Sequence, residues 1–110
     1  MVKLKDKNII SCSSQGDLSS LSKDDMNKFF LELNDGWEIV DGYLQRKFKF
    51  PNFNDGLKFA NEIGKICDHQ KHHPIIVLSW AKLIVKLRTV KIDDISINDF
   101  ILAANIDDII

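Results

Sequence analysis

The sequence has few residues that cross-link or interrupt a chain. Its 110 residues include only 2 cysteines, 2 prolines and 5 glycines. Cys12 and Cys67 lie far apart and form no CxxC pair, the spacing expected of a redox motif or of half a zinc site. We therefore expect reduced thiols in a cytoplasmic protein, with Cys67 in the core and Cys12 in a loose arm.

Long apolar runs and an excess of one charge are absent as well. Apolar runs such as Ile75 to Leu78 are far too short to span a bilayer, and no apolar segment near the N-terminus predicts a secretory signal peptide. The formal net charge is -1, so no overall basic field favours nucleic acid or an acidic membrane. A hydrophobic fraction of 45% and a charged fraction of 28% are ordinary for one soluble globular domain.

The N-terminal part of the chain divides into an arm and the start of a domain. Residues 1–17 show no clean period and end in a small polar run, which predicts a partly disordered arm before a domain over residues 18–110. A first helix is expected after Ser22, which can cap it, with Asp25 completing a capping box. An apolar stripe at helical spacing follows, and Asn34-Asp35-Gly36 ends the helix.

Two strands are expected next. Residues 37–40 and 43–50 flank Asp41-Gly42, a strong signal for a two-residue hairpin turn because both residues tolerate positive φ. Apolar and polar residues alternate in the second strand, as in an antiparallel strand with one buried face. Lys47 and Lys49 fall on the other face, which would be open to solvent or to a partner subunit.

A second helix and a second pair of strands follow. An apolar stripe predicts a helix over residues 54–69, and Pro74 prevents its continuation. Residues 75–80 and 83–89 are apolar and rich in β-branched side chains, so they predict two strands. The turn between them is expected near Ala81-Lys82, although it lacks glycine and asparagine.

The last helix completes the predicted fold. Ser96 and Asp99 repeat the capping-box pattern, and the helix is expected to run to about residue 105, with Asp107 and Asp108 in solvent. The order helix, strand, strand, helix, strand, strand, helix predicts an α+β domain. It favours a four-stranded antiparallel sheet with three helices packed on one face.

The junction between the second helix and the third strand carries the side chains best suited to chemistry. Asp68, His72 and His73 lie just before Pro74. The pKa of an unperturbed histidine is about 6.5, so it can act as an acid and as a base near neutral pH. A carboxylate four residues upstream could orient an imidazole and raise its basicity. The plain alternative is a polar helix end, where cationic histidine favours the helix dipole.

The spacing of these residues resembles that of the pterin-4a-carbinolamine dehydratase family. Three residues separate Asp68 from His72-His73-Pro74, five more lead to Trp80, and Asp99 follows. The resemblance covers roughly residues 18 to 108. Secondary marks of the family are also present: Gly36-Trp37, residues 46–50, Phe53, Phe59-Ala60, Thr89, Ala103 and Ile106-Asp107.

The resemblance implies a lyase that dehydrates 4a-hydroxytetrahydrobiopterin to quinonoid dihydrobiopterin and so supports tetrahydrobiopterin recycling. Such a reaction needs an acid for the departing hydroxyl and a base for a ring nitrogen. We expect His72 and His73 to divide these roles, with Asp68 as a third catalytic residue. No metal, nucleotide or redox cofactor is implied. The expected substrate-binding residues are Lys71, Pro74, Trp80, Arg88, Thr89, Val90 and Lys91.

Two positions depart from the family pattern. Val90 stands where the family has histidine or tryptophan, and valine can neither give nor accept a proton. Lys71 stands where relatives commonly have aspartate or asparagine. His69 could replace part of the missing histidine. A non-catalytic relative, either a pterin-binding module or a dimerisation and transcriptional cofactor, is therefore the alternative.

A metal site and the expected partners complete the sequence-based picture. The spacing of Cys67, His69, His72 and His73 is not that of a closed zinc site. An exposed sheet edge favours self-association, and the resemblance implies a homodimer or homotetramer. The expected partners are thus a small pterin substrate and a second copy of the chain, with no membrane and no direct nucleic acid contact.

Overall fold

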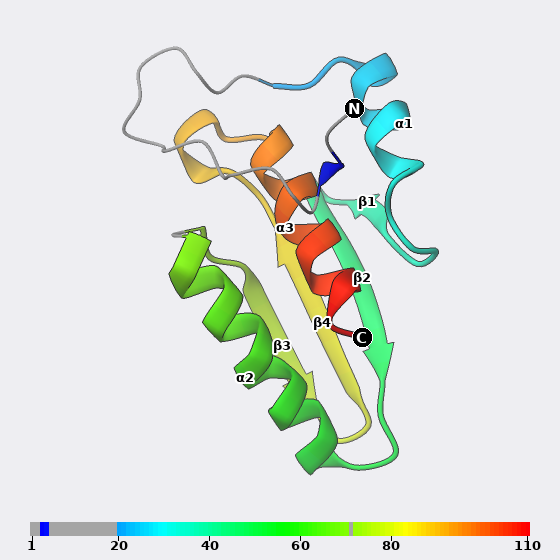
Figure 1. Ribbon diagram of the computed structural model, residues 1–110, viewed down its shortest axis with the longest axis vertical. Helices are drawn as coiled ribbons and strands as arrows, with labels where there is room; N and C mark the ends of the chain where they lie inside the picture. Colours follow the sequence, from blue (N-terminus) through cyan, green and yellow to red (C-terminus); the bar gives the residue numbers. More distant parts are fainter. Residues whose placement is uncertain (1–2, 5–19, 71) are drawn as a thin grey trace.

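A computed structural model describes residues 3, 4, 20–70 and 72–110 of the chain (Figure 1). Its α-helices and strands follow one another in the predicted order. Cys12 and most of the expected N-terminal arm lie outside these residues, as does Lys71. The elements, in chain order, are α1 (Lys23–Phe30), β1 (Glu38–Val40), β2 (Tyr43–Lys49), α2 (Phe53–Gln70), β3 (Ile75–Ser79), β4 (Lys82–Leu87), the short 3₁₀ helix η2 (Val90–Ile92) and α3 (Ile97–Asp108).

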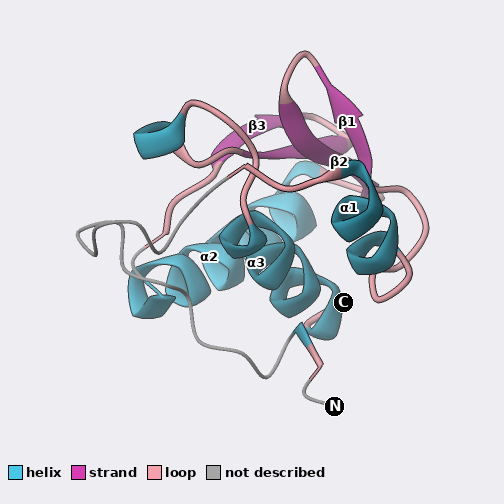
Figure 2. Ribbon diagram, turned by 90° about the horizontal axis from the view of Figure 1, so that it is seen from above, coloured by secondary structure: helices cyan, strands magenta, loops and turns pink. Residues whose placement is uncertain are grey.

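The four strands form one antiparallel sheet in the order β1-β2-β4-β3. Figure 2 shows α1, α2 and α3 on the same side of this sheet. The predicted α+β class, with three helices on one face of a four-stranded antiparallel sheet, is thereby confirmed. Lys47 and Lys49 are exposed, as expected for the uncovered face of the sheet.

The core lies between the sheet and the helices. Phe100 of α3 is fully buried, and its ring packs against Phe29 and Phe30 of α1, with ring centroids 5.6 and 5.1 Å away. Leu4 is also fully buried, and its backbone N–H donates to Glu32 at 2.9 Å. Burial of these large apolar side chains is the main favourable term in folding, and here it also holds α3 against the first helix.

Local turn chemistry explains the first of the two hairpins. Asp41 and Gly42 both have positive φ, 51° and 82°, as the predicted two-residue turn requires. The second turn falls at Trp80 and Ala81, one residue before its predicted place, and joins β3 to β4. Beyond β4 the chain leaves the sheet two residues earlier than predicted, because Thr89 pairs in an isolated bridge with Asp94 around η2.

The last turn of α3 corrects one prediction. The sequence predicts that Asp107 is solvated, but its side chain is only 8% exposed and accepts three hydrogen bonds. The donors are Trp37 Nε1 at 2.8 Å, an Arg46 guanidinium nitrogen at 2.7 Å and the Asn34 backbone N–H at 2.8 Å. The helix therefore continues past its predicted end at about Asn105, because Asp107 is held by β2 and by the loop before β1.

Candidate active site

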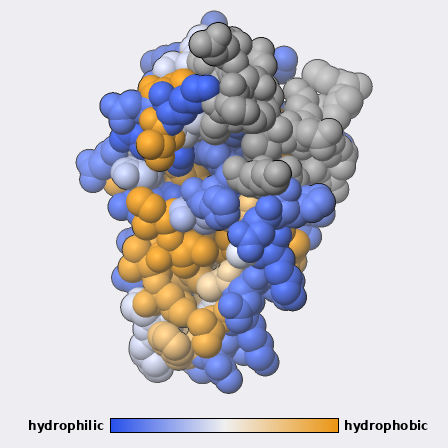
Figure 3. Space-filling view, turned by 90° about the vertical axis from the view of Figure 1, so that its left-hand side faces the viewer, coloured by the Kyte–Doolittle hydropathy of each residue, from blue (hydrophilic) through white to orange (hydrophobic). Residues whose placement is uncertain are grey.

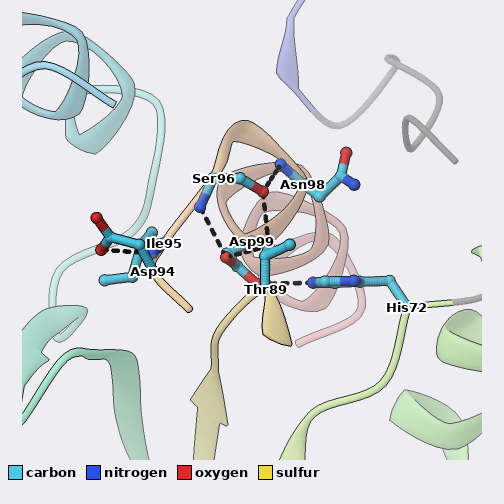
Figure 4. A network of polar contacts seen from close by, with 7 residues as sticks. All are labelled: His72, Thr89, Asp94, Ile95, Ser96, Asn98 and Asp99. Carbon is cyan, nitrogen blue, oxygen red and sulfur yellow. Dashed lines mark hydrogen bonds and ion pairs between the residues drawn. The ribbon is translucent and has the colours of Figure 1, made fainter. Parts of the chain in front are cut away.

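His72 lies in the interior, between the end of α2 and the start of α3. It is 6% exposed, and its Nε2 lies 2.7 Å from Oδ1 of Asp99, which is fully buried (Figure 4). His72 follows the end of α2, and its backbone N–H donates to the Cys67 carbonyl at 3.3 Å, within the last turns of that helix. The ring therefore occupies a fixed place against α3 although Pro74 prevents a longer helix.

Asp99 is held in turn by two neighbours. The Thr89 hydroxyl donates to Asp99 Oδ2 at 2.9 Å, and the Ser96 backbone N–H donates to the same oxygen at 2.9 Å. Oγ of Ser96 lies 2.6 Å from Oγ1 of Thr89 and accepts from the Asn98 backbone N–H at 3.2 Å. Figure 4 shows these side chains converging at the N-terminus of α3. The predicted capping box of Ser96 and Asp99 is confirmed, and the same carboxylate also binds His72.

His73 lies differently. Its side chain is 63% exposed, and its Nε2 lies 3.1 Å from Oδ1 of Asp68, whose side chain is 83% exposed. The adjacent histidines thus face two different carboxylates, one buried and one in solvent. Because an exposed ion pair contributes little to stability, Asp68 restrains His73 less firmly than Asp99 restrains His72.

Among the expected substrate-binding residues that the structure describes, only Thr89 joins the buried network. Pro74 lies between His73 and the start of β3. Trp80 is 73% exposed in the turn at the far end of β3, about 16 Å along a five-residue strand. Arg88 donates to Asp93 at 2.8 Å and lies over the Tyr43 ring.

The two remaining expected residues lie on η2. Val90 is 87% exposed, and Lys91 is exposed. The chain thus brings Thr89 to Asp99, the partner of His72, but leaves the side chain of its neighbour Val90 in solvent. Trp80 is separated from the two histidines by the length of β3.

Three hollows in the surface are lined by residues other than the two histidines. One of about 560 Å³ runs along α2 and includes Asp68. Others of about 430 and 370 Å³ lie beside Asp107 and beside Phe59. None of these three hollows borders His72 or His73. Within the described ranges, no group of three or more histidine, cysteine, aspartate or glutamate side chains is placed to hold a metal ion.

Cys67 is inert by position. It is buried, as predicted, and unpaired with another cysteine. Burial, together with the nearby Asp68 carboxylate, raises the pKa of the Cys67 thiol from 9.0 to about 12. A thiol held in this protonated form is a poor nucleophile.

No helix in the described part of the chain is long and apolar enough to cross a membrane.

Ser96 and Asp99 are the site residues for which the sequence favours a capping role, although Asp99 also belongs to the family spacing. The capping-box pattern found both of them, and the family spacing ended at Asp99, but neither signal shows which side chain lies opposite the carboxylate. That information comes from the packing of α3 against the end of α2.

These features define a small α+β domain with a histidine–carboxylate pair buried between two helices. A family model described as pterin 4 alpha carbinolamine dehydratase matches residues 19–109. A relative from Alkaliphilus metalliredigens is 38% identical over 97% of this chain and 96% of its own length. A relative from Rickettsia bellii is 40% identical over 94% of this chain and 91% of its own length. Both are named "Putative pterin-4-alpha-carbinolamine dehydratase".

A solved structure is also similar. The crystal structure titled "transcriptional coactivator/pterin dehydratase", from Brucella melitensis, is 26% identical, with a TM-score of 0.76. The similarity covers 83% of this chain and 98% of that chain. This chain belongs to the pterin-4a-carbinolamine dehydratase family.

Proposed function

We propose that this chain is a hydro-lyase that dehydrates 4a-hydroxytetrahydrobiopterin to quinonoid dihydrobiopterin and so takes part in tetrahydrobiopterin recycling. Membership of the family supports the reaction class. The observation that carries the proposal is the buried contact between His72 and Asp99, 2.7 Å long, with His73 beside it. A titratable ring fixed in the interior next to a second, exposed ring is an arrangement suited to proton transfer.

The chemistry requires two proton transfers. Water leaves when an acid protonates the 4a-hydroxyl, and the double bond forms when a base removes a proton from a ring nitrogen. Each assistance typically contributes about 10²–10⁴-fold to the rate. In our proposal His72 and His73 share the two transfers, Asp68 acts on His73, and Thr89 acts on His72 through Asp99. Lys71, Pro74, Val90 and Lys91 would contact the pterin.

The second candidate function is a non-catalytic one. Val90, at the position where the resemblance implies histidine or tryptophan, is 87% exposed and brings no titratable group to the site. The Brucella melitensis structure carries both roles in its title, a transcriptional coactivator and a pterin dehydratase. A pterin-binding or protein-binding role without turnover is therefore the alternative to the enzyme.

Self-association is a further part of the proposal. β3 is an edge strand in the described sheet and contains no proline or charged residue. Ile75 and Val77 on it are 48% and 46% exposed. Figure 3, which faces the side where α2 and β3 lie, shows an apolar area next to a polar one. Because a bare apolar edge is a template for strand pairing, we propose that β3 pairs with β3 of a second copy to form a homodimer, the unit from which a homotetramer could be built. A reduced, buried Cys67 fits the cytoplasmic location that we propose.

A dehydration assay separates the candidates. Purified protein is mixed with chemically generated 4a-hydroxytetrahydrobiopterin, and the appearance of the quinonoid product is followed against the rate in buffer. Acceleration supports the enzyme. Pterin binding without acceleration supports the binding module, and no binding supports a role with a protein partner.

A further inference from the structure

We propose that Thr89 and Ser96 are positioning residues that act through Asp99 to keep the hydrogen of neutral His72 on Nε2, so that Nδ1 is the ring atom that exchanges protons. The proposal deepens the proposed function and rests on it for the role of Nδ1. The position of the hydrogen, however, depends only on the contacts of the buried network. The contacts among the side chains of this network are 2.6 to 2.9 Å long, and most of its members are fully buried: Thr89, Ser96, Asn98 and Asp99.

The hydrogens in this network can be placed one at a time. The Ser96 backbone N–H and the Thr89 hydroxyl both donate to Asp99 Oδ2, each at 2.9 Å. A carboxylate accepts hydrogen bonds and donates none. Oδ2 accepts from two donors, and one of them is a backbone N–H, which can donate but never accept. Both contacts therefore favour the ionised carboxylate of Asp99. The remaining oxygen, Oδ1, therefore also accepts, and the Nε2 of His72 that lies 2.7 Å away carries the hydrogen.

The outer hydroxyl pair has a fixed direction as well. Thr89 has one hydroxyl hydrogen, and it is used on Asp99. In the 2.6 Å contact with Ser96, Thr89 must therefore accept, and the Ser96 hydroxyl donates. The Ser96 oxygen still accepts from the Asn98 backbone N–H at 3.2 Å, so the last member is anchored to the first turn of α3. Hydrogens thus point in one direction, from Ser96 through Thr89 to Asp99.

This arrangement selects one tautomer of His72. A neutral imidazole carries a hydrogen on only one nitrogen, and the hydrogen bond made by that nitrogen decides which one. With Nε2 committed to Asp99, Nδ1 holds the lone pair. The family resemblance predicts that Thr89 touches substrate, but its hydroxyl is buried and turned toward Asp99, so it positions the histidine rather than the pterin.

The tautomer can be measured without substrate. Long-range proton–nitrogen NMR correlations on ¹⁵N-labelled protein distinguish the two neutral forms, at a pH high enough to leave the ring neutral, and His72→Gln assigns the signals. We expect the Nε2–H form in the wild type. A dominant Nδ1–H form would overturn the proposal whether or not the protein dehydrates pterins. A wild type that shows the expected tautomer but no turnover would instead remove the proposed function.

Variants of Thr89 test the chain of contacts. Thr89→Val keeps the shape but loses the hydroxyl, so we expect a mixture of tautomers and a fall in kcat of about tenfold, with KM unchanged. Thr89→Ser restores the hydroxyl and should restore both readouts. If Thr89→Val does not fold, Ser96→Ala, which keeps the backbone N–H, should show a smaller change in the same direction. Unaltered NMR signals and kcat in the folded variants would overturn the roles of Thr89 and Ser96.

Discussion

Oδ1 of Asp107, near the end of α3, lies 2.7 Å from the guanidinium of Arg46 on β2. Both side chains are largely buried, with exposures of 8% and 18%. The same carboxylate oxygen also accepts from the Trp37 indole at 2.8 Å. One residue thus ties the last helix to the sheet and to the segment before β1.

Replacing Asp107 by asparagine should lower the free energy of unfolding by about 2–4 kcal/mol. The change leaves the Arg46 charge unpaired in a mostly buried place and sets an amide N–H against a donor. Urea denaturation measures the loss, and Trp37 fluorescence reports the local change. Asp35→Asn, at an exposed position, is the matched control and should alter stability by no more than about 0.5 kcal/mol. Equal stability of the two variants would contradict the structural role of Asp107.

Cys67 should resist labelling in the folded protein. Burial and the Asp68 carboxylate raise its pKa to about 12, so little thiolate exists at pH 8. In a Cys12→Ser variant, a disulfide reagent should react with almost no thiol in the native state and with one thiol in denaturant. Rapid labelling of the native variant would contradict the burial of this side chain.

The same shift predicts a change of stability with pH. The pKa of the Cys67 thiol is higher in the folded chain than its ordinary 9.0, so the unfolded chain releases this proton first. The contribution of the thiol to stability is therefore complete below about pH 9 and falls as the pH rises toward 12. Urea denaturation from pH 8 to 10.5 should show less loss in Cys67→Ala than in the wild type, after each is compared with its own value at pH 8. Parallel losses would contradict this assignment.

Val77 tests the pairing of β3. A lysine at this edge position would place like charges near each other in the proposed homodimer, so Val77→Lys should be monomeric, with a mass of 12.6 kDa. The wild type should have twice that mass by light scattering. Leu31→Lys adds the same charge at an exposed position on another surface and should leave the dimer intact. A monomeric wild type, or a dimeric Val77→Lys, would contradict the proposed interface.

Local chemistry explains why much of the fold could be predicted. The Asp41-Gly42 turn and the Ser96 cap follow from the residues themselves, and the structure has both. The end of β4 was predicted two residues too late, since the bridge between Thr89 and Asp94 depends on how the following loop closes. Propensity and periodicity depend on neighbours along the chain, so they do not predict contacts between residues that only folding brings together.

The site was predictable only in part for the same reason. His72 and His73 were found from their spacing, but the partner of His72 lies 27 positions away on α3. A carboxylate four residues upstream was the natural local partner, and in the structure it lies against His73 instead. The sequence predicts a solvated Asp107 because nothing in its own stretch of chain indicates that Trp37 and Arg46 will lie against it.

Val90→His tests whether the missing titratable group limits the reaction. The position is 87% exposed, so the substitution should change the free energy of unfolding by no more than about 0.5 kcal/mol. If the chain is an enzyme that lacks one proton-transfer group, kcat for dehydration should rise by about tenfold or more. Val90→Thr, which is similar in shape and has no group that titrates near neutral pH, is the control. No gain from histidine would indicate that another residue already fills the role.

The rate of dehydration by His72→Ala tests the central claim most directly. The side chain that Asp99 holds is removed, while the hydrogen bonds of Thr89 and Ser96 to Asp99 remain available to keep the start of α3 intact. We predict that kcat falls by about 10²-fold or more relative to the wild type, in a variant whose circular dichroism is unchanged. A folded His72→Ala protein with wild-type turnover would contradict the account.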